Sequence, residues 1–265
     1  MKNILLLMMG GSGVRCGAGI PKQYVEVDDV PIFAYILKKY SLMPEVHHIV
    51  VVSRREWIPF VRRWVMRLRI DGVDEIAAGG ETRSASVLSG LTAAASLAAD
   101  EDVVLLHDAT HPYVDVEGTR EVIKAVREIG GATLAQFQYD TVYRRNFDDM
   151  LVEVLPRRKM VTGASPEGFL FGDLYRIYRE MRPEQFEVMT SAGAIALANR
   201  IRMKVIEAHV LNLKITWQRD LETFRRLART YFFPEACGFP EACGGSKNEE
   251  SAGTGADGAG SGVEG

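Results

Sequence analysis

The chain contains few cysteines, no long apolar run and no excess of positive charge. Its three cysteines, Cys16, Cys237 and Cys243, form neither a disulfide framework nor a set with metal-ligand spacing, so we expect free thiols in a reducing compartment. No apolar run approaches the ~20 residues of a membrane helix. The apolar stretch at the N-terminus is too short for a secretory signal. These absences predict a cytoplasmic protein with no membrane partner.

The charge balance argues against a nucleic-acid partner. The 265-residue chain has 32 lysines and arginines against 35 aspartates and glutamates, a formal net charge of −3 at pH 7, whereas nucleic-acid-binding domains usually carry a clear basic excess. Arginines are frequent between Arg54 and Arg69, where they alternate with aromatic and aliphatic residues. Because their spacing is helical, we interpret them as the solvated face of a helix and predict no nucleic-acid partner.

One stretch near the N-terminus carries the clearest functional pattern. Ile4–Met9 has the composition of a buried parallel strand, and a glycine cluster follows it, with Arg15 inside the cluster and Lys22 just beyond. Glycines let backbone N–H groups approach an anion, and several successive N–H groups form an anion-binding concavity. The pattern predicts a polyphosphate site at the strand end, where open α/β sheets bind ligands. A glycine-rich turn with two solvated cations is the alternative.

Two well-known phosphate loops do not fit this stretch. A Walker A loop would need Gly-Lys-Ser/Thr, and a dinucleotide fold would need a third glycine, whereas Gly11-Ser-Gly13 is followed by Val-Arg-Cys. The stretch does match G-x-G-x-R followed by P-K, here Gly11 to Arg15 and Pro21-Lys22. That signature is typical of nucleotidyltransferases.

Strands and helices alternate from residue 2 to about 138, which predicts a doubly wound, mostly parallel, Rossmann-like α/β sheet. From 140 to 158, two short alternating segments around an acidic turn predict a β-hairpin that leaves the sheet as an arm, about 139–160. An exposed hairpin favours a partner strand, so we expect a homodimer formed through this arm. The expected helices are 31–40, 54–69, 87–98 and 116–129, and the expected strands are 48–52, 74–78, 102–108 and 132–137.

The C-terminal part divides into a folded segment and a tail. Ser165-Pro-Glu167 is expected to open a helix over Phe169–Met181, and a last helix is expected over Gln218–Tyr231. We assign residues 1–232 to one nucleotidyltransferase domain. Residues 233–265 repeat Phe-Pro-Glu-Ala-Cys-Gly and continue as a Gly/Ser/Ala-rich tract, which cannot bury enough apolar surface to order, so we predict a disordered tail.

Two further strand ends carry candidate site residues. Gly79-Gly80 opens a helix whose first turn holds Arg83 and Ser86, a second place for an anion or a base edge. Asp108 ends a strand near the predicted phosphate site, where a carboxylate suits Mg²⁺ or its water shell. A turn or helix-cap role is the alternative for Asp108. We interpret His107 as a hydrogen-bonded structural histidine rather than a base.

Five separated motifs extend over residues 2 to about 230. They are Gly10–Arg15 with Pro21–Tyr24, Gly79–Arg83 with Ser86-Val87, His107–Ala109 with Pro112, Asp140-Thr141, and Asn212–Thr216 with Asp220-Leu221. On these motifs the chain resembles the IspD/TarI family, which contains the methylerythritol 4-phosphate and ribitol 5-phosphate cytidylyltransferases. The ribitol-phosphate branch is favoured by Gly10-Gly11, by Arg55-Glu-Trp57 and by Pro156–Met160.

The resemblance implies CTP-dependent transfer to a polyol or sugar phosphate, in which pyrophosphate leaves and Mg²⁺ bridges the phosphates. Such chemistry needs positioning and cations more than a covalent nucleophile. Arg15, Lys22, Lys214 and an Arg157 supplied by the partner's arm would be catalytic, and Asp108 would bind the metal. The implied nucleotide contacts are Met8, Met9, Gly10, Gly11, Ser12, Gly13, Arg15, Lys22, Gly79, Gly80, Glu81, Thr82, Arg83, Ser86, Asp108 and Ala109; the implied acceptor contacts are His111, Thr141, Arg157, Ser165 and Lys214.

Three places depart from the family pattern. Met9 and Gly10 replace alanines before the loop glycines, and His111 replaces the arginine of HDAxRP. Thr190-Ser191 replaces Thr-Asp after the arm, so an expected carboxylate is missing. The change at His111 affects an expected acceptor contact, and the missing carboxylate at Ser191 affects metal geometry or helix capping. They leave two alternatives to a ribitol 5-phosphate enzyme: a methylerythritol 4-phosphate enzyme, or a nucleotide-binding homologue with weak or no turnover.

Overall fold

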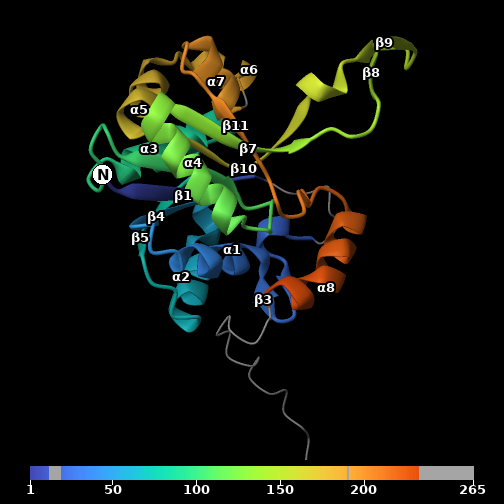
Figure 1. Cartoon of the computed structure of the whole chain (residues 1–265). Coiled ribbons are helices and arrows are strands. Elements are labelled where there is room, and N and C mark those ends of the chain that lie inside the picture. The colour runs from blue at the N-terminus through green and yellow to red at the C-terminus, as the bar shows by residue number, and fades with distance from the viewer. Residues whose placement is uncertain (12–18, 190, 233–265) are drawn as a thin grey trace, which may run out of the picture.

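A seven-stranded sheet with strand order β11-β7-β10-β6-β1-β4-β5 runs through the protein (Figure 1). This computed structural model describes residues 1–11, 19–189 and 191–232. The neighbours of β1 and β4 are parallel, whereas β10 is antiparallel to both β6 and β7. The strands are β1 (Asn3–Met9), β4 (His48–Ser53), β5 (Val73–Ala78), β6 (Val103–Asp108), β7 (Gly131–Phe137), β10 (Val161–Leu170) and β11 (Lys204–Glu207).

Helices cover both faces of the sheet. Successive side chains of a buried strand point to opposite faces, so both faces carry apolar side chains that must be covered. Leu5 and Leu7 of β1 pack toward one face and Ile4 and Leu6 toward the other, and all four are fully buried. The mostly parallel three-layer α/β fold is therefore confirmed. The first face is covered by α1 (Ile32–Ser41), α2 (Ile58–Arg67), α4 (Val116–Ile129) and α8 (Gln218–Phe232), and the second by α3 (Arg83–Ala94), α5 (Phe171–Glu180), α6 (Pro183–Val188) and α7 (Ala192–Ala198).

Helix α4 has the predicted bounds because both of its ends are encoded locally. The Asp115 carboxylate accepts a hydrogen bond from Gly118 N at 2.8 Å, which satisfies a free N–H of the first turn. Gly130 ends the helix in the left-handed region at φ 101°, a conformation that glycine adopts at little cost. Between these caps, Val122 and Val126 lie one turn apart and are buried against the sheet.

The expectation that Ser165-Pro-Glu167 opens a helix is wrong. These residues lie in the middle of strand β10, and α5 begins only at Phe171. Proline has no N–H for a ladder, but the pairing of β10 with β7 is interrupted between Gly163 and Glu167, so Pro166 lies where the ladder does not need its donor. Helix α6 is a further element that the sequence did not predict. Strand β10 is important because it carries Ser165 to the end of β6.

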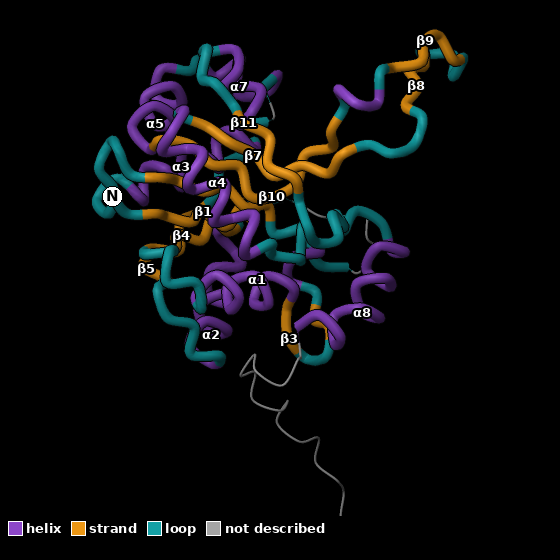
Figure 2. The backbone as a smooth tube through the Cα atoms, viewed as in Figure 1, coloured by secondary structure: helices purple, strands orange, loops and turns teal. Residues whose placement is uncertain are grey.

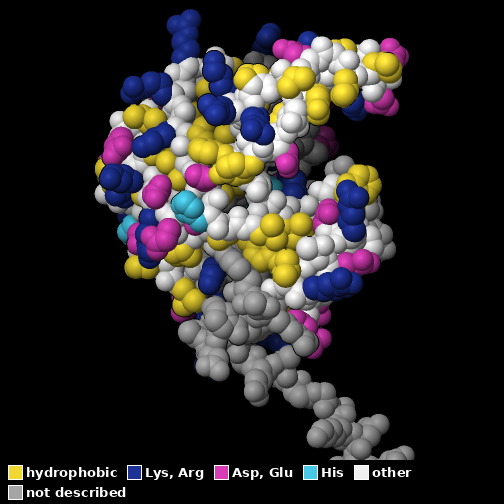
Figure 3. Space-filling model, turned by 45° about the vertical axis from the view of Figure 1, so that its right-hand side comes forward, with side chains coloured by type: hydrophobic (Ala, Val, Ile, Leu, Met, Phe, Trp, Pro, Cys, Tyr) yellow, Lys and Arg dark blue, Asp and Glu magenta, His cyan; other side chains and the backbone are white. Residues whose placement is uncertain are grey.

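The predicted hairpin is formed by β8 (Val142–Arg145) and β9 (Leu151–Leu155), a separate two-stranded antiparallel sheet. It stands away from the body of the protein (Figures 1 and 2), and hydrophobic side chains line its surface (Figure 3). A short 3₁₀ turn, η4 (Arg157–Lys159), returns the chain to β10. The predicted disordered tail, residues 233–265, lies outside the described residues, so that prediction and the domain boundary at 232 stay untested.

Smaller elements surround the start of the chain. They are the 3₁₀ turns η2 (Lys22–Tyr24) and η3 (Arg55–Trp57) and a two-stranded sheet of β2 (Glu26–Val27) and β3 (Val30–Pro31).

None of the helices in the described part of the chain is both long enough and apolar enough to cross a membrane.

Candidate functional site

Asp108 lies at the carboxyl end of β6, and both of its carboxylate oxygens accept hydrogen bonds. Its Oδ1 accepts hydrogen bonds from Thr110 N at 3.1 Å and from Thr110 Oγ1 at 2.9 Å, and its Oδ2 accepts one from Lys214 Nζ at 3.2 Å. Burial alone would raise the pKa of the Asp108 carboxyl. The nearby charge of Lys214, with the Thr110 N–H and the charge of Arg83, instead holds that pKa well below its usual range, so the group is ionised.

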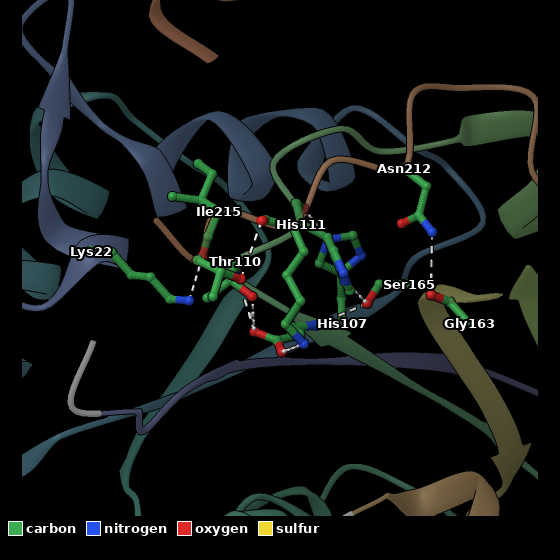
Figure 4. A network of polar contacts seen from close by, with 11 residues as sticks. Lys22, His107, Thr110, His111, Gly163, Ser165, Asn212 and Ile215 are labelled. Atoms are coloured by element: carbon green, nitrogen blue, oxygen red, sulfur yellow. Dashed lines mark hydrogen bonds and ion pairs between the residues drawn. The ribbon is translucent and has the colours of Figure 1, made fainter. Parts of the chain in front are cut away.

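Lys22 reaches the same strand ends from the opposite side. Its ammonium donates a hydrogen bond to the carbonyl oxygen of Ile215, the residue after Lys214 (Figure 4). The Ile215 N–H donates in turn to Thr110 O at 2.8 Å. The loop around Lys214 therefore joins Lys22 to the end of β6. Lys22 and Lys214, the two cations predicted to be catalytic, are thus both tied to the end of β6 that carries Asp108. Their catalytic roles stay predictions.

His107 and His111 are both neutral at pH 7, for the same reason. His107 is fully buried; its Nε2 donates to His111 O at 2.8 Å, which leaves Nδ1 to accept from Tyr40 Oη at 2.9 Å. Burial lowers the pKa of His107 to about 4, as expected of a structural histidine. Burial also lowers the pKa of His111 to about 4; the charge of Asp108 opposes this lowering, and the charges of Lys214 and Lys22 add to it. His111 thus offers an uncharged imidazole, in place of the family's arginine charge.

Ser165 links His111 to the end of β6. Its Oγ lies 2.8 Å from His111 Nδ1 and accepts a hydrogen bond from Asp108 N at 3.3 Å. Beside it, Asn212 Nδ2 donates to Gly163 O at 3.3 Å, which ties the Lys214 loop to β10 (Figure 4). Two predicted acceptor contacts, His111 and Ser165, are therefore direct neighbours of Asp108.

The two predicted glycine motifs touch through Ser86. A Cβ added at Gly10 would lie 2.8 Å from Ser86 Oγ, and one added at Gly79 would lie 3.0 Å from the same atom and 3.6 Å from the Gly10 Cα. Gly80 N donates a hydrogen bond to Ser86 Oγ at 3.1 Å. Segments about 70 residues apart in sequence thus form one small surface of bare backbone, as a nucleotide site requires. Ser86 lies between the two loops and hydrogen-bonds the second one.

Other predicted nucleotide contacts have clear local positions. The side chains of Met8 and Met9 are buried in opposite cores, so only their backbone is available to a ligand. The Ala109 N–H donates to Met8 O at 3.0 Å. Thr82 caps α3 by accepting from Ala85 N at 3.1 Å, and Glu81 is exposed next to it. Ser12, Gly13 and Arg15 lie outside the described residues.

Gln23 and Tyr24 shape the site but were missed as site residues. Gln23 is buried, and its Nε2 donates to both Met9 O and Gly11 O at 2.8 Å, so one amide holds the backbone on both sides of Gly10. Tyr24 Oη lies 2.9 Å from Ser53 Oγ, at the end of the neighbouring strand β4. Their only signal in the sequence was their place in the Pro21–Tyr24 motif. A buried glutamine has no periodic pattern that marks it.

Thr141 and Arg157 do not join the Asp108 group within one protomer. They line a cavity of about 350 Å³ on the arm, together with Leu155 and Arg158. The Arg157 guanidinium donates to Tyr139 O at 2.7 Å. Within residues 1–11, 19–189 and 191–232, no cluster of three or more His, Cys, Asp and Glu side chains could hold a metal ion. A cation at Asp108 would therefore need oxygen ligands from elsewhere, such as phosphates and water.

Two cytidylyltransferases match most of the chain. A ribitol-5-phosphate cytidylyltransferase of Streptococcus agalactiae serotype III (strain NEM316) is 30% identical over 227 residues, which is 85% of this chain and 95% of the relative. A 2-C-methyl-D-erythritol 4-phosphate cytidylyltransferase of Thermotoga neapolitana is 31% identical over 231 residues, which is 86% of this chain and 98% of the relative.

Solved structures agree on the fold. The 4-diphosphocytidyl-2C-methyl-D-erythritol synthase of Anaerococcus prevotii superposes with a TM-score of 0.70 at 21% identity and covers 86% of this chain and 96% of its own. The family model described as IspD, 2-C-methyl-D-erythritol 4-phosphate cytidylyltransferase, matches residues 4–229. The resemblance drawn from the five motifs is confirmed: the chain belongs to the IspD family and is a cytidylyltransferase, one class of nucleotidyltransferase.

Proposed function

We propose that the protein transfers a cytidylyl group from CTP to D-ribitol 5-phosphate, forming CDP-ribitol and pyrophosphate. The observation that carries this proposal is the convergence of Lys22, Lys214 and the ionised Asp108 beside the bare backbone at Gly10 and Gly79. Placed cations and accessible N–H groups are what a triphosphate needs when its charge shifts toward a leaving group.

The reaction needs no covalent intermediate and no general base. An anionic oxygen of the acceptor's phosphate attacks the α-phosphorus of CTP, and the bond from that phosphorus to the bridging oxygen breaks. The electron pair leaves with pyrophosphate, whose growing charge Lys22 and Arg15 would stabilise. Lys214 would hold the acceptor phosphate. The neutral state of His111 agrees with this scheme, because the nucleophile is already deprotonated and requires no base.

Mg²⁺ fits the carboxylate at the end of β6. Asp108 stays ionised and offers hard oxygen ligands, and Mg²⁺ is commonly held by one or two carboxylates together with substrate phosphates and water. When bound, the cation would supply positive charge that offsets the negative charge of the phosphates. Lys214 now occupies Oδ2 of Asp108, so we expect its ammonium to move from that oxygen to a phosphate when the nucleotide and metal bind.

We also propose that the arm pairs with a second copy of the chain. Its apolar side chains are exposed on the two short strands and on the turn between them, and such a hairpin is a natural surface for association. Pairing would bring Arg157 and Thr141 of one protomer to the Asp108 site of its partner. The exposed apolar side chains of the arm are Tyr143, Phe147, Met150, Leu151, Val152 and Val154.

The choice of acceptor rests on Gly10-Gly11, on Arg55-Glu-Trp57 and on Pro156–Met160, since relatives of both substrate types are about equally similar. Purified protein should be incubated with CTP, Mg²⁺ and either ribitol 5-phosphate or methylerythritol 4-phosphate, and pyrophosphate release measured. We expect faster release with ribitol 5-phosphate. Preference for methylerythritol 4-phosphate would favour that alternative, and CTP binding without release in either reaction would identify a nucleotide-binding homologue with little turnover.

A further inference from the structure

A cavity of about 780 Å³ lies at the end of the sheet opposite to the candidate functional site. It is enclosed by the start of β1, the loop that leads into β4 and the outer face of α4, and its lining includes Asn3, Glu45, His47, Ile123, Lys124 and Arg127. Since Asn3 is the first residue of β1 and Met9 the last, about 20 Å of strand separate this cavity from the backbone at Gly10. The volume is within the range of small-molecule sites, and neither the motifs nor the proposed reaction uses the lining residues.

Asn3 joins the two walls of the cavity. Its side chain is buried; Oδ1 accepts a hydrogen bond from Arg127 Nη2 at 3.0 Å, and Nδ2 donates to Glu45 O at 2.6 Å. The Asn3 N–H donates to His47 Nδ1 at 3.0 Å, so a neutral His47 carries its proton on Nε2. A buried amide whose donor and acceptor are both used fixes the groups that it joins. The Arg127 guanidinium is therefore held in place before any ligand binds.

Two cations of α4 at the cavity have no carboxylate partner. Lys124 and Arg127 lie one turn apart and are exposed, and neither forms an ion pair with a residue that the structure describes. Arg120, a further lining cation, is instead paired with Glu45 at 2.7 Å. The other lining carboxylate, Glu128, forms no such pair, so the cavity is positive on balance. A fixed guanidinium beside an ammonium is suited to an oxyanion.

Glu45 adds an acceptor that lacks a donor. The Arg120 hydrogen bond and the residue's own N–H lower the pKa of the Glu45 carboxyl, so the group is ionised. Its Oε1 accepts from Arg120 Nε, whereas its Oε2 is buried and has no hydrogen-bond partner of normal geometry within the described ranges. An unpaired buried carboxylate oxygen is unfavourable and points to a missing partner. A hydroxyl group supplied from the cavity would satisfy it.

We propose that this cavity is a binding site for a small phosphate monoester that carries hydroxyl groups, separate from the nucleotide site. Lys124, Arg127 and the Nε2–H of His47 would donate to the phosphate, which offers three strong acceptor oxygens. Glu45 would accept a hydrogen bond from a hydroxyl, and the buried Ile123 would contact the carbon chain. The inference does not rest on the proposed function, because none of these residues takes part in it.

Glycerol 3-phosphate is the probe, because it combines a phosphate with two hydroxyls, and its Kd is measured by calorimetry without CTP or Mg²⁺. We expect Lys124→Gln to weaken its binding by about tenfold, the loss of one charge-assisted hydrogen bond. The Tm should stay the same, since the Lys124 side chain is exposed and makes no ion pair. Arg127→Gln should weaken binding by a similar factor, although it also removes the hydrogen bond to Asn3.

Two control variants separate this cavity from other sources of binding. Lys204→Gln removes an exposed lysine of β11 and matches the change in net charge. Lys22→Ala removes a cation of the proposed nucleotide site. Both controls should bind glycerol 3-phosphate as the wild type does. Pyrophosphate release by Lys124→Gln should also equal that of the wild type, so a failure of either proposal leaves the other standing.

Propyl phosphate, which lacks the hydroxyls, measures the contribution of Glu45. The wild type should bind it about fivefold more weakly than glycerol 3-phosphate, the effect of one hydrogen bond. Glu45→Ala should bind the two probes equally well. The contact from Asn3 is to the backbone oxygen of Glu45, so this variant keeps the frame of the cavity.

Four results would overturn the inference. They are no binding of glycerol 3-phosphate at millimolar concentrations, wild-type affinity in Lys124→Gln, an equal loss in Lys204→Gln, and binding that is lost in Lys22→Ala, which would place the probe in the nucleotide site. Equal binding of both probes to the wild type would also contradict it, because the cavity would then hold an adventitious ion only.

Discussion

Replacing Asp108 with asparagine tests the site where its geometry is best defined. Asparagine keeps an oxygen for the Thr110 N–H and hydroxyl, but its amide nitrogen must then face the Lys214 ammonium, which lies 3.2 Å from Oδ2 in the wild type. One charge-assisted hydrogen bond is lost and two donors oppose each other. If Asp108 binds the metal, the electrostatic contribution to the transition state is lost as well. We expect turnover to fall by about 10²- to 10³-fold.

The effect of Asp108→Asn on stability should be much smaller than its effect on turnover. The side chain of Asp108 is 20% exposed and that of Lys214 is 53% exposed, so solvent screens the pair and its contribution is about 0.2–1 kcal/mol. The pKa of Asp108 is lowered in the folded protein. Its stabilising contribution is therefore fully present above the unfolded pKa, near 4, and is lost as the pH falls toward the lower folded pKa.

Urea denaturation at pH 7 and at pH 3.5, with pyrophosphate release at pH 7, would measure these effects. The wild type should lose more stability than Asp108→Asn between the two pH values, and the two proteins should differ by about 1 kcal/mol or less at pH 7. Asp108→Asn with turnover within threefold of the wild type would refute a metal or charge role for this carboxylate. A large loss of stability at pH 7 would show instead that the pair is mainly structural.

Three other changes test neighbouring parts of the account. Lys22→Ala should reduce kcat by about 10²-fold, since it removes a cation that acts on transition-state charge; an unchanged kcat would remove Lys22 from the mechanism. Gly10→Ala places a Cβ 2.8 Å from Ser86 Oγ and should cost about 1–3 kcal/mol of stability and weaken CTP binding; normal binding would mean that the glycine surface is not used. Arg157→Ala and Lys22→Ala, each strongly impaired alone, should regain activity when mixed, because a heterodimer with the arm arginine in trans carries one intact site; no recovery in a confirmed mixed dimer would place Arg157 in its own protomer's site.

The elements that the sequence predicted well are those with local signals. Strand β1 is a continuous apolar run ended by glycines, and α4 has a cap at each end, so neither depends on distant contacts to be recognised. Asp108 was found because a carboxylate at the end of a buried strand faces the ligand edge of an α/β sheet. The meeting of Gly10 and Gly79 was not predicted as a contact, although both loops were identified separately.

The features that the sequence did not predict depend on long-range pairing. Strand β10 pairs with β6 and β7, both distant in sequence, and a proline and two glycines weaken its local strand signal. Gln23 gained its role only when the chain folded back beneath Met9 and Gly11. Glu167 was interpreted only as part of a helix start, because its hydrogen-bond partner Gly193 lies on a helix whose packing the sequence does not reveal.

The most direct test is a crystal structure of the protein with CTP and Mg²⁺. The account predicts the triphosphate against Gly10 and Gly79, with the Lys22 ammonium moved from Ile215 O to a phosphate and Asp108 bound to the metal or its water shell. A nucleotide bound elsewhere, while Lys22 and Asp108 keep their present partners, would contradict it.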